Sequence, residues 1–285
     1  MGTTARQLPS ALEEFDRLLM LAAGRRFDLF LDYDGTLTPI VGRPELAILA
    51  EDTRTVLREL ARRIPVALIS GRDLDDLRRL VAIEEVHYAG SHGFEIQAAD
   101  GKRLDAEPAA AYLPALERAE KELRRRLERV PGALVERKRY TLAVHYRLVE
   151  PQRHNEIEAA VAAAAAACPE LRRTEGKKVF ELQPAVEWNK GKALKRLADV
   201  LGLQRTSDFP LFLGDDRTDE DAFRELRDWG AGILVRDADV PTWAQFALDS
   251  PAEVNEFLHR LLAGLDRARG AAGADRGGPE SRGRF

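Results

Sequence analysis

The chain has 285 residues, of which 45% are hydrophobic and 32% charged, as in a folded protein with one sizeable domain or two smaller ones. Its 44 basic and 48 acidic residues give a formal net charge of −4, which excludes an overall positive field for nucleic acid or an anionic membrane. Cys168 is the single cysteine, and there is no secretory pattern and no apolar run near the roughly 20 residues of a membrane span. We therefore expect a cytoplasmic protein.

The first 90 residues alternate between amphipathic stretches and short apolar runs. Apolar residues at helical spacing predict helices over 9–23, 51–63 and 73–82, and buried runs predict strands over 26–31, 65–69 and 86–89. This alternation is typical of a doubly wound parallel sheet, because parallel strands need a crossover helix between them.

The pattern changes after about residue 107. Here a helix, two strand-like runs, a second helix and a further strand are predicted over 113–129, 133–139, 140–148, 154–167 and 177–183. From Gly191 the first pattern resumes, with helices over 191–201 and from 219, and strands over 210–213, 231–235 and 245–248.

These changes predict an α/β protein with two units. A Rossmann-like core with a doubly wound parallel sheet, residues 1–107 and 184–265, is interrupted by an inserted α/β cap domain, residues 108–183. Residues 266–285 are rich in Gly and Arg and are predicted to form a disordered tail. Two compact units of this size should be stable as a monomer.

Acidic and hydroxyl side chains follow three of the predicted core strands. Asp32 and Asp34 follow the first, Ser70-Gly71-Arg72 the second, and Asp215, Asp216 and Asp219 a later one. The carboxyl ends of parallel strands share one edge of a sheet, where ligands bind. Two carboxylates with one residue between them can act as nucleophile and proton donor, and crowded carboxylates need a cation, for which Mg²⁺ is the economical choice. The alternative is that these residues only form turns and cap helices, as Thr218 and Asp221 do in a capping-box pattern.

Four motifs occur in a fixed order, namely DYDGTLTPI from Asp32, SGR from Ser70, NKG from Asn189 and GDDRTDEDAF from Gly214. In this order they resemble those of the haloacid-dehalogenase-type phosphohydrolases. With GSHGFE, HYR and GKKVFELQP between them, residues 26–262 are most similar to the trehalose-6-phosphate phosphatase family. The resemblance implies a Mg²⁺-dependent hydrolase that releases phosphate from trehalose 6-phosphate in trehalose biosynthesis.

The resemblance also implies catalytic roles. Asp32 would be the nucleophile that forms an aspartyl-phosphate, and Asp34 would be the general acid and then the general base. Ser70 and Lys190 would hold the phosphoryl oxygens. Mg²⁺ would be bound by the Asp32 carboxylate, the Asp34 backbone carbonyl and Asp215, with support from Asp216 and Asp219.

A cap can choose the substrate and exclude water from the site. Because side chains two or four positions apart on a strand share a face, Glu136 should project with Lys138, and Lys177 with Glu181. From the residues alone, a solvated face with weak ion pairs is the simpler alternative. The resemblance implies instead that the substrate is bound by Gly71, Arg72, Glu136, Lys138, Lys177 and Glu181. His92 is expected to stabilise a turn rather than act as a base.

Two other functions stay open at this stage. The same core motifs occur in other sugar-phosphate phosphatases and in phosphosugar mutases, in which the cap differs. A non-catalytic partner of a trehalose-phosphate synthase is the remaining alternative, and such a protein would not need Asp32. Whether the chain works beside a synthase is left open by the sequence.

Overall fold

The protein is described by a computed structural model that covers residues 3–105 and 111–274. Its main sheet has eight strands in the order β14-β12-β11-β2-β3-β4-β5-β6. The six parallel strands are β14 (Phe246–Leu248), β12 (Ala231–Val235), β11 (Asp208–Gly214), β2 (Arg26–Leu31), β3 (Val66–Ile69) and β4 (His87–Gly90). Two antiparallel strands, β5 (Glu95–Gln97) and β6 (Arg103–Asp105), complete one edge. The predicted α/β fold class, with its parallel-dominated sheet, is confirmed.

Helices cover both faces of this sheet. One face packs against α1 (Phe15–Ala22), α2 (Glu51–Ala61), α3 (Leu74–Val81) and α8 (Pro251–Ala274), and the other against α6 (Lys190–Leu201) and α7 (Glu220–Leu226). Side chains of β2 alternate between the two layers, with Leu29 in the first apolar cluster and Phe30 in the second. Both faces are therefore apolar, as a doubly wound sheet requires.

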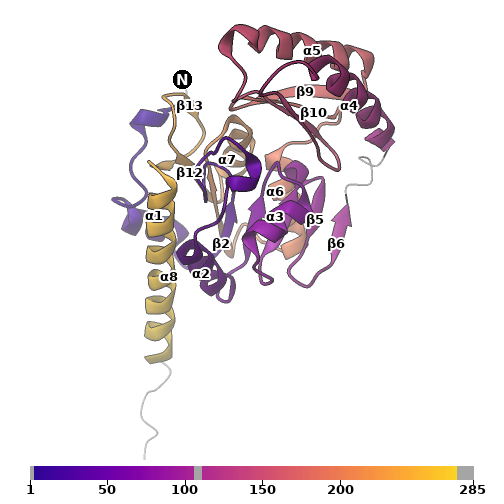
Figure 1. The fold of residues 1–285 in the computed structure, drawn as a ribbon. Coiled ribbons are helices and arrows are strands. Elements are labelled where there is room, and N and C mark those ends of the chain that lie inside the picture. The colour runs from indigo at the N-terminus through magenta and orange to yellow at the C-terminus, as the bar shows by residue number, and fades with distance from the viewer. Residues whose placement is uncertain (1–2, 106–110, 275–285) are drawn as a thin grey trace, which may run out of the picture.

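A second sheet lies above the carboxyl ends of the parallel strands (Figure 1). Its four antiparallel strands have the order β7-β8-β10-β9, with bounds Leu134–Arg137, Leu142–His145, Val179–Pro184 and Leu171–Gly176. Helices α4 (Leu113–Leu127) and α5 (His154–Ala167) pack on one face of it with their own apolar cluster. The opposite face is directed at the core.

The strand order of the main sheet indicates where a ligand can bind. The chain runs from β2 to β3 and β4 on one side of β2, and β11 and β12 lie on the other side. The order therefore reverses between β2 and β11, and a crevice forms outside the carboxyl ends of strands at such a reversal. Asp32 follows β2 and Asp215 follows β11, so both stand at this point.

Several predicted elements need correction. The strand predicted over 177–183 begins at Val179, because 171–176 form an unpredicted partner strand, β9, and Lys177 lies in the turn between them. The helix predicted over 9–23 begins at Phe15, since residue 11 instead donates from its backbone N–H to the Ala247 carbonyl beside β14. Strands β5 and β6 and helix α8 were not predicted either.

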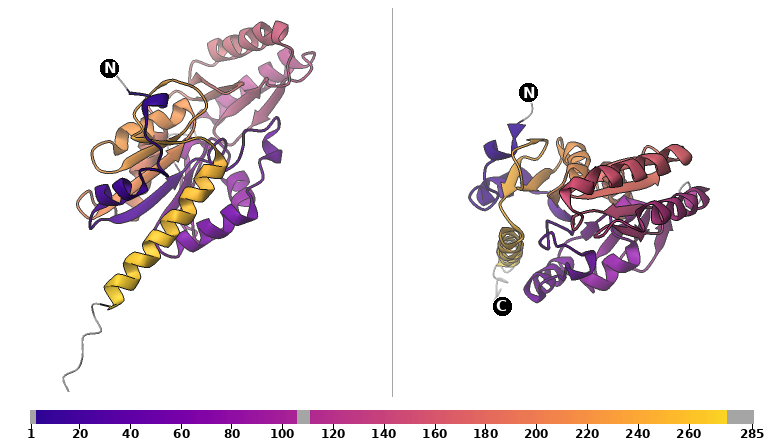
Figure 2. Two further views of the ribbon diagram at one scale, coloured as in Figure 1. Left: turned by 90° about the vertical axis from the view of Figure 1, so that its left-hand side faces the viewer. Right: turned by 45° about the horizontal axis from the view of Figure 1, so that its top comes forward.

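The predicted tail is the clearest error. Helix α8 continues to Ala274, so the prediction of disorder is wrong for residues 266–274. Alanine favours helix strongly, and Asp266 accepts a 2.7 Å hydrogen bond from Nε of Arg63. Figure 2 shows α8 running along the core and beyond it, away from the second sheet. Residues 275–285 lie outside the described part. Within that part, no helix has the length and apolar character needed to cross a membrane.

Candidate active site

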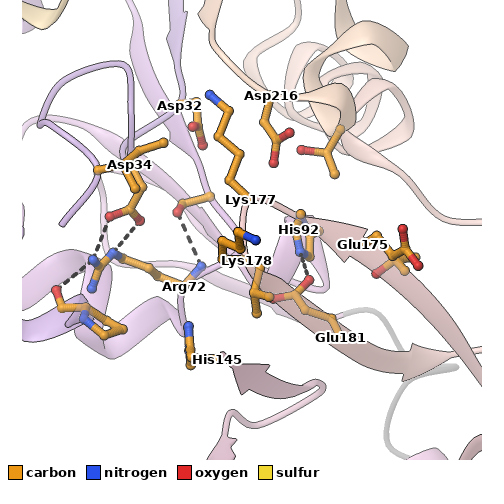
Figure 3. A pocket seen from close by; sticks show the side chains of 18 of the residues that line it. Asp32, Asp34, Arg72, His92, His145, Glu175, Lys177, Lys178, Glu181 and Asp216 are labelled. Carbon is orange, nitrogen blue, oxygen red and sulfur yellow. Dashed lines mark hydrogen bonds and ion pairs between the residues drawn. The ribbon is translucent and has the colours of Figure 1, made fainter. Parts of the chain in front are cut away.

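A pocket lies between the carboxyl edge of the main sheet and the second sheet (Figure 3). It brings together most of the residues predicted to form the site, namely Asp32, Asp34, Ser70, Gly71, Arg72, Glu136, Lys138, Lys177, Glu181, Lys190, Asp215 and Asp216. The remaining one, Asp219, is buried directly beneath it and contacts Lys190. The core residues of this set meet because parallel strands end at one edge, and the others reach the pocket from the second sheet and its turns.

Lys190 lies between two carboxylates at the base of the pocket. Asn189 caps the N-terminus of α6 through its side chain, so Lys190 is the first helical residue and points into the site. Its Nζ donates to Oδ1 of Asp32 over 2.8 Å and to Oδ1 of Asp219 over 2.6 Å. Burial alone would lower the pKa of Lys190, but the two carboxylates outweigh it and raise that pKa. Lys190 is therefore a fixed buried cation next to Asp32.

Three carboxylates form an acidic triad, defined here as Asp32, Asp215 and Asp219. Each offers an oxygen within 4.8 Å of the others, a spacing that fits one metal ion. Oδ1 of Asp215 is buried and has no hydrogen-bond partner among the described residues. Burial, reinforced by Asp219, raises the pKa of Asp215 to about 6. A hard divalent cation would satisfy this oxygen and offset the repulsion, so the donor set fits Mg²⁺.

The triad differs in one member from the predicted ligand set, in which Asp219 only supported the metal. Oδ2 of Asp219 accepts from the backbone N–H groups of Asp215 and Asp216, over 3.0 and 2.9 Å, which fixes the turn after β11. Asp216 accepts from the backbone of Arg217 at the start of the next helical turn. The capping interpretation therefore describes Asp216, while Asp219 both fixes the turn and joins the triad.

Gly35 allows the turn after β2 to approach the triad closely. Its φ is +86°, and a Cβ atom placed there would lie 2.1 Å from Oδ2 of Asp215. Any side chain at this position would displace a triad carboxylate, so the DYDG motif needs glycine for two independent reasons.

Glu181 of β10 is linked to the core in two ways, indirectly through Lys138 of the cap and directly through His92. Oε1 of Glu181 accepts from Nζ of Lys138 over 3.0 Å, and Lys138 also donates to the Gly71 carbonyl over 2.8 Å. Oε2 lies 2.8 Å from Nε2 of His92, whose backbone N–H donates to the Ser70 carbonyl. Burial raises the pKa of Glu181, but Lys138 and His92 outweigh it and hold that pKa below its usual range. Glu181 is thus a buried, ionised acceptor at the pocket.

The expected side-chain pairs within the strands are replaced by other partners. Glu136 lies 2.7 Å from Nε2 of His145 on the neighbouring strand, and Lys138 pairs with Glu181. Lys177, being in a turn, does not share a face with Glu181 and instead contacts Asp215. The contact between His92 and Glu181 was not predicted, because His92 was expected only to stabilise a turn. Its position in the sequence does indicate a place in the site, since His92 follows β4 at the same sheet edge as Ser70.

Comparisons with known proteins agree with this geometry. Residues 30–252 match the family described as Trehalose-phosphatase. A probable trehalose-phosphate phosphatase 4 of Oryza sativa subsp. japonica is 41% identical over 262 residues, covering 90% of this chain and 71% of the relative. Trehalose-phosphate phosphatase B of Arabidopsis thaliana is 38% identical over 267 residues, with the same two coverages. The C-terminal domain of a C. albicans trehalose-6-phosphate phosphatase superposes with a TM-score of 0.78 at 28% identity, covering 90% of this chain and 98% of that one. The chain therefore belongs to the trehalose-phosphatase family.

Proposed function

We propose that this protein hydrolyses trehalose 6-phosphate to trehalose and inorganic phosphate with the help of Mg²⁺. One observation carries the proposal. Asp32, a member of the acidic triad that is paired with Lys190, shares a single pocket with Glu181 of β10 and with Lys138, which directly follows β7. The first group suits phosphoryl transfer, and the second offers an acceptor and a donor for sugar hydroxyls.

In the proposed reaction, a carboxylate oxygen of Asp32 attacks phosphorus while the bond between phosphorus and the sugar oxygen breaks. Asp34 gives its proton to the departing oxygen, which leaves trehalose and an aspartyl-phosphate. Asp34 then takes a proton from the water that attacks this phosphorus, and Asp32 is released with inorganic phosphate. Lys190 and Ser70 orient the phosphoryl oxygens throughout.

Mg²⁺ held by Asp32, Asp215 and Asp219, with the Asp34 carbonyl, would neutralise charge on the phosphoryl group. The protein residues hold the reacting atoms in place. Ser70 is buried and its hydroxyl accepts from the backbone N–H of Arg72 over 3.2 Å, so its own proton is free to donate to a phosphoryl oxygen. Preorganised donors of this kind supply much of the catalytic effect in phosphoryl transfer.

The division into a core of 1–107 and 184–265 and a cap of 108–183 is part of the proposal. Separate apolar clusters support it, because α4, α5 and strands β7 to β10 pack around a cluster of their own. We further propose that the protein is a cytoplasmic monomer, and that any association with a trehalose-phosphate synthase is not needed for turnover, since Asp32, Lys190 and Glu181 already share one pocket.

A phosphate-release panel tests the function. Purified protein is assayed with trehalose 6-phosphate, glucose 6-phosphate and sucrose 6-phosphate, each with Mg²⁺ or with EDTA. We expect the highest kcat/KM for trehalose 6-phosphate, dependence on Mg²⁺, and no turnover by Asp32→Asn with folding intact. Faster release from another sugar phosphate would refute the substrate, and a second phosphorylated sugar among the products would indicate a mutase. Unchanged turnover by Asp32→Asn would refute the mechanism.

A further inference from the structure

Arg72 is almost entirely enclosed by protein, although the sequence predicted that it binds substrate. Its side chain is 7% exposed. Nε and Nη2 donate to Oδ2 and Oδ1 of Asp34, both over 2.7 Å, and Nη2 donates also to the Pro44 carbonyl over 2.8 Å. Nη1 donates to Oδ2 of Asp76 over 2.8 Å. Figure 3 shows the fork on Asp34 as a pair of dashed lines. The guanidinium is therefore committed to protein acceptors.

The Arg72 fork fixes the orientation of the Asp34 carboxylate. A planar guanidinium that holds both oxygens of a carboxylate also fixes the plane of that carboxylate. Arg72 is itself held on one side by Asp76 and Pro44 and lies 5.2 Å from the centroid of the buried Tyr33 ring. The Asp34 side chain nevertheless remains 39% exposed and lines the pocket. A rigid frame thus presents this carboxyl group to the substrate.

We propose that Arg72 is a positioning residue for proton transfer by Asp34, and that it does not bind the substrate. This inference rests on the proposed function, in which Asp34 protonates the departing sugar oxygen. A general acid must lie within hydrogen-bond distance of that oxygen with its proton directed at it, and a small misplacement lowers the rate strongly. The contribution of Arg72 should therefore appear only in reactions whose leaving group needs a proton.

Two substrates distinguish positioning of Asp34 from a general effect of Arg72 on the active site. An alkoxide such as the sugar oxygen needs protonation as it leaves, whereas p-nitrophenolate leaves without a proton. The ratio kcat/KM reports steps up to loss of the leaving group, so hydrolysis of p-nitrophenyl phosphate should not depend on the position of Asp34. We expect Arg72→Lys to lower kcat/KM at least about tenfold for trehalose 6-phosphate and less than about threefold for p-nitrophenyl phosphate. Equal losses for both substrates would overturn the inference.

A double-mutant cycle with Asp34→Asn tests whether Arg72 acts through Asp34. When Asp34 can no longer donate a proton, replacing Arg72 should cost little more, so the two losses should not multiply. We expect Arg72→Lys to lower kcat/KM for trehalose 6-phosphate less than about threefold in the Asp34→Asn background. A full tenfold loss there, or a rise in KM in both backgrounds, would show instead that Arg72 binds substrate.

Asp76→Asn provides a milder variant outside the pocket. It removes the negative charge that helps to hold Arg72, without touching Asp34, and the Asp76 side chain is 29% exposed, so folding should survive. We expect a smaller loss with the same selectivity for trehalose 6-phosphate, and a loss shared by both substrates would contradict the inference. Thermal unfolding of each variant checks the fold. If the unmodified protein did not hydrolyse trehalose 6-phosphate, the proposed function would fail first, which is a distinguishable outcome.

Discussion

Nζ of Lys177, in the turn of the β9–β10 hairpin, donates to Oδ2 of Asp215 over 2.6 Å. This contact joins the second sheet to a member of the acidic triad at the end of β11. Lys177 also lies 3.2 Å from Oδ2 of Asp237. Burial would lower the pKa of Lys177, but Asp215 and Asp237 outweigh it and raise that pKa, so the side chain stays charged. A lysine and a metal ion would therefore share one carboxylate.

Removing the Lys177 charge should tighten metal binding in the absence of substrate. A cation this close opposes a second cation at Asp215, so we expect Lys177→Met to lower the Kd for Mg²⁺ about fivefold, measured by isothermal titration calorimetry. Lys178→Met is the matched control, because Lys178 lines the same pocket but lies over the Tyr146 ring. Unchanged or weaker binding by Lys177→Met would contradict the prediction.

Lys190→Met should destabilise the fold strongly. The substitution keeps an unbranched side chain of similar length but leaves Asp32 and Asp219 buried without their shared cation, which typically costs about 3–5 kcal/mol of unfolding free energy. Added Mg²⁺ should restore part of this loss by replacing the missing charge. Urea unfolding with and without Mg²⁺ measures both effects. Lys195→Met, on the exposed side of the same helix, should change little. A Lys190→Met protein as stable as the original would refute this account.

The core of the site was predictable because a local rule determines it. Asp32, Ser70 and Asp215 each follow a buried strand, and the parallel arrangement brings strand ends to one edge whatever the loops do. Lys190 was different, since nothing in its spacing shows that α6 begins beside β2. Only the resemblance placed it in the site.

The cap partners could not be predicted, because they depend on pairing between strands. Strand β9 has the sequence LRRTEG, in which apolar and polar residues do not alternate, because its side chains are mostly half-buried. It is a strand because its backbone pairs with β10. Without β9, Lys177 appeared to lie inside a strand. The contacts of Arg72 with Pro44 and Asp76 were not predicted either, because both partners lie outside the recognised motifs.

Glu181→Gln should separate sugar recognition from chemistry. The amide keeps the shape but loses the charge that Lys138 and His92 hold, so it is a weaker acceptor for sugar hydroxyls. We expect KM for trehalose 6-phosphate to rise about tenfold, with little change for p-nitrophenyl phosphate, which lacks the sugar. The control is Glu175→Gln, because Glu175 lines the pocket but pairs with Arg173. An unchanged KM for the sugar phosphate would exclude Glu181 from recognition.

Asp28 should make the protein less stable as the pH rises. It is fully buried in β2, and neither of its carboxylate oxygens has a hydrogen-bond partner in the described part of the chain. Burial raises its pKa to about 7, against the opposing effect of Arg26 at 3.6 Å. Between about pH 4 and pH 7 the folded state therefore binds more protons than the unfolded state, so the unfolding free energy falls through this range and stays low above it.

Asp28→Asn removes this dependence, because an amide does not ionise. We expect the variant to match the original protein near pH 4 and to be more stable at pH 8 by about 2–4 kcal/mol, measured by urea unfolding. Asp208→Asn is a control of opposite sign. Burial would raise the pKa of Asp208, but hydrogen bonds from Gln204 and Ser207 and the charge of Arg26 lower it, so its stabilisation is present above pH 4 and lost in acid. Asp208→Asn should therefore destabilise the fold at pH 8. If Asp28→Asn also destabilised the fold at pH 8, the buried carboxylate of Asp28 would be stabilising, which would contradict the prediction.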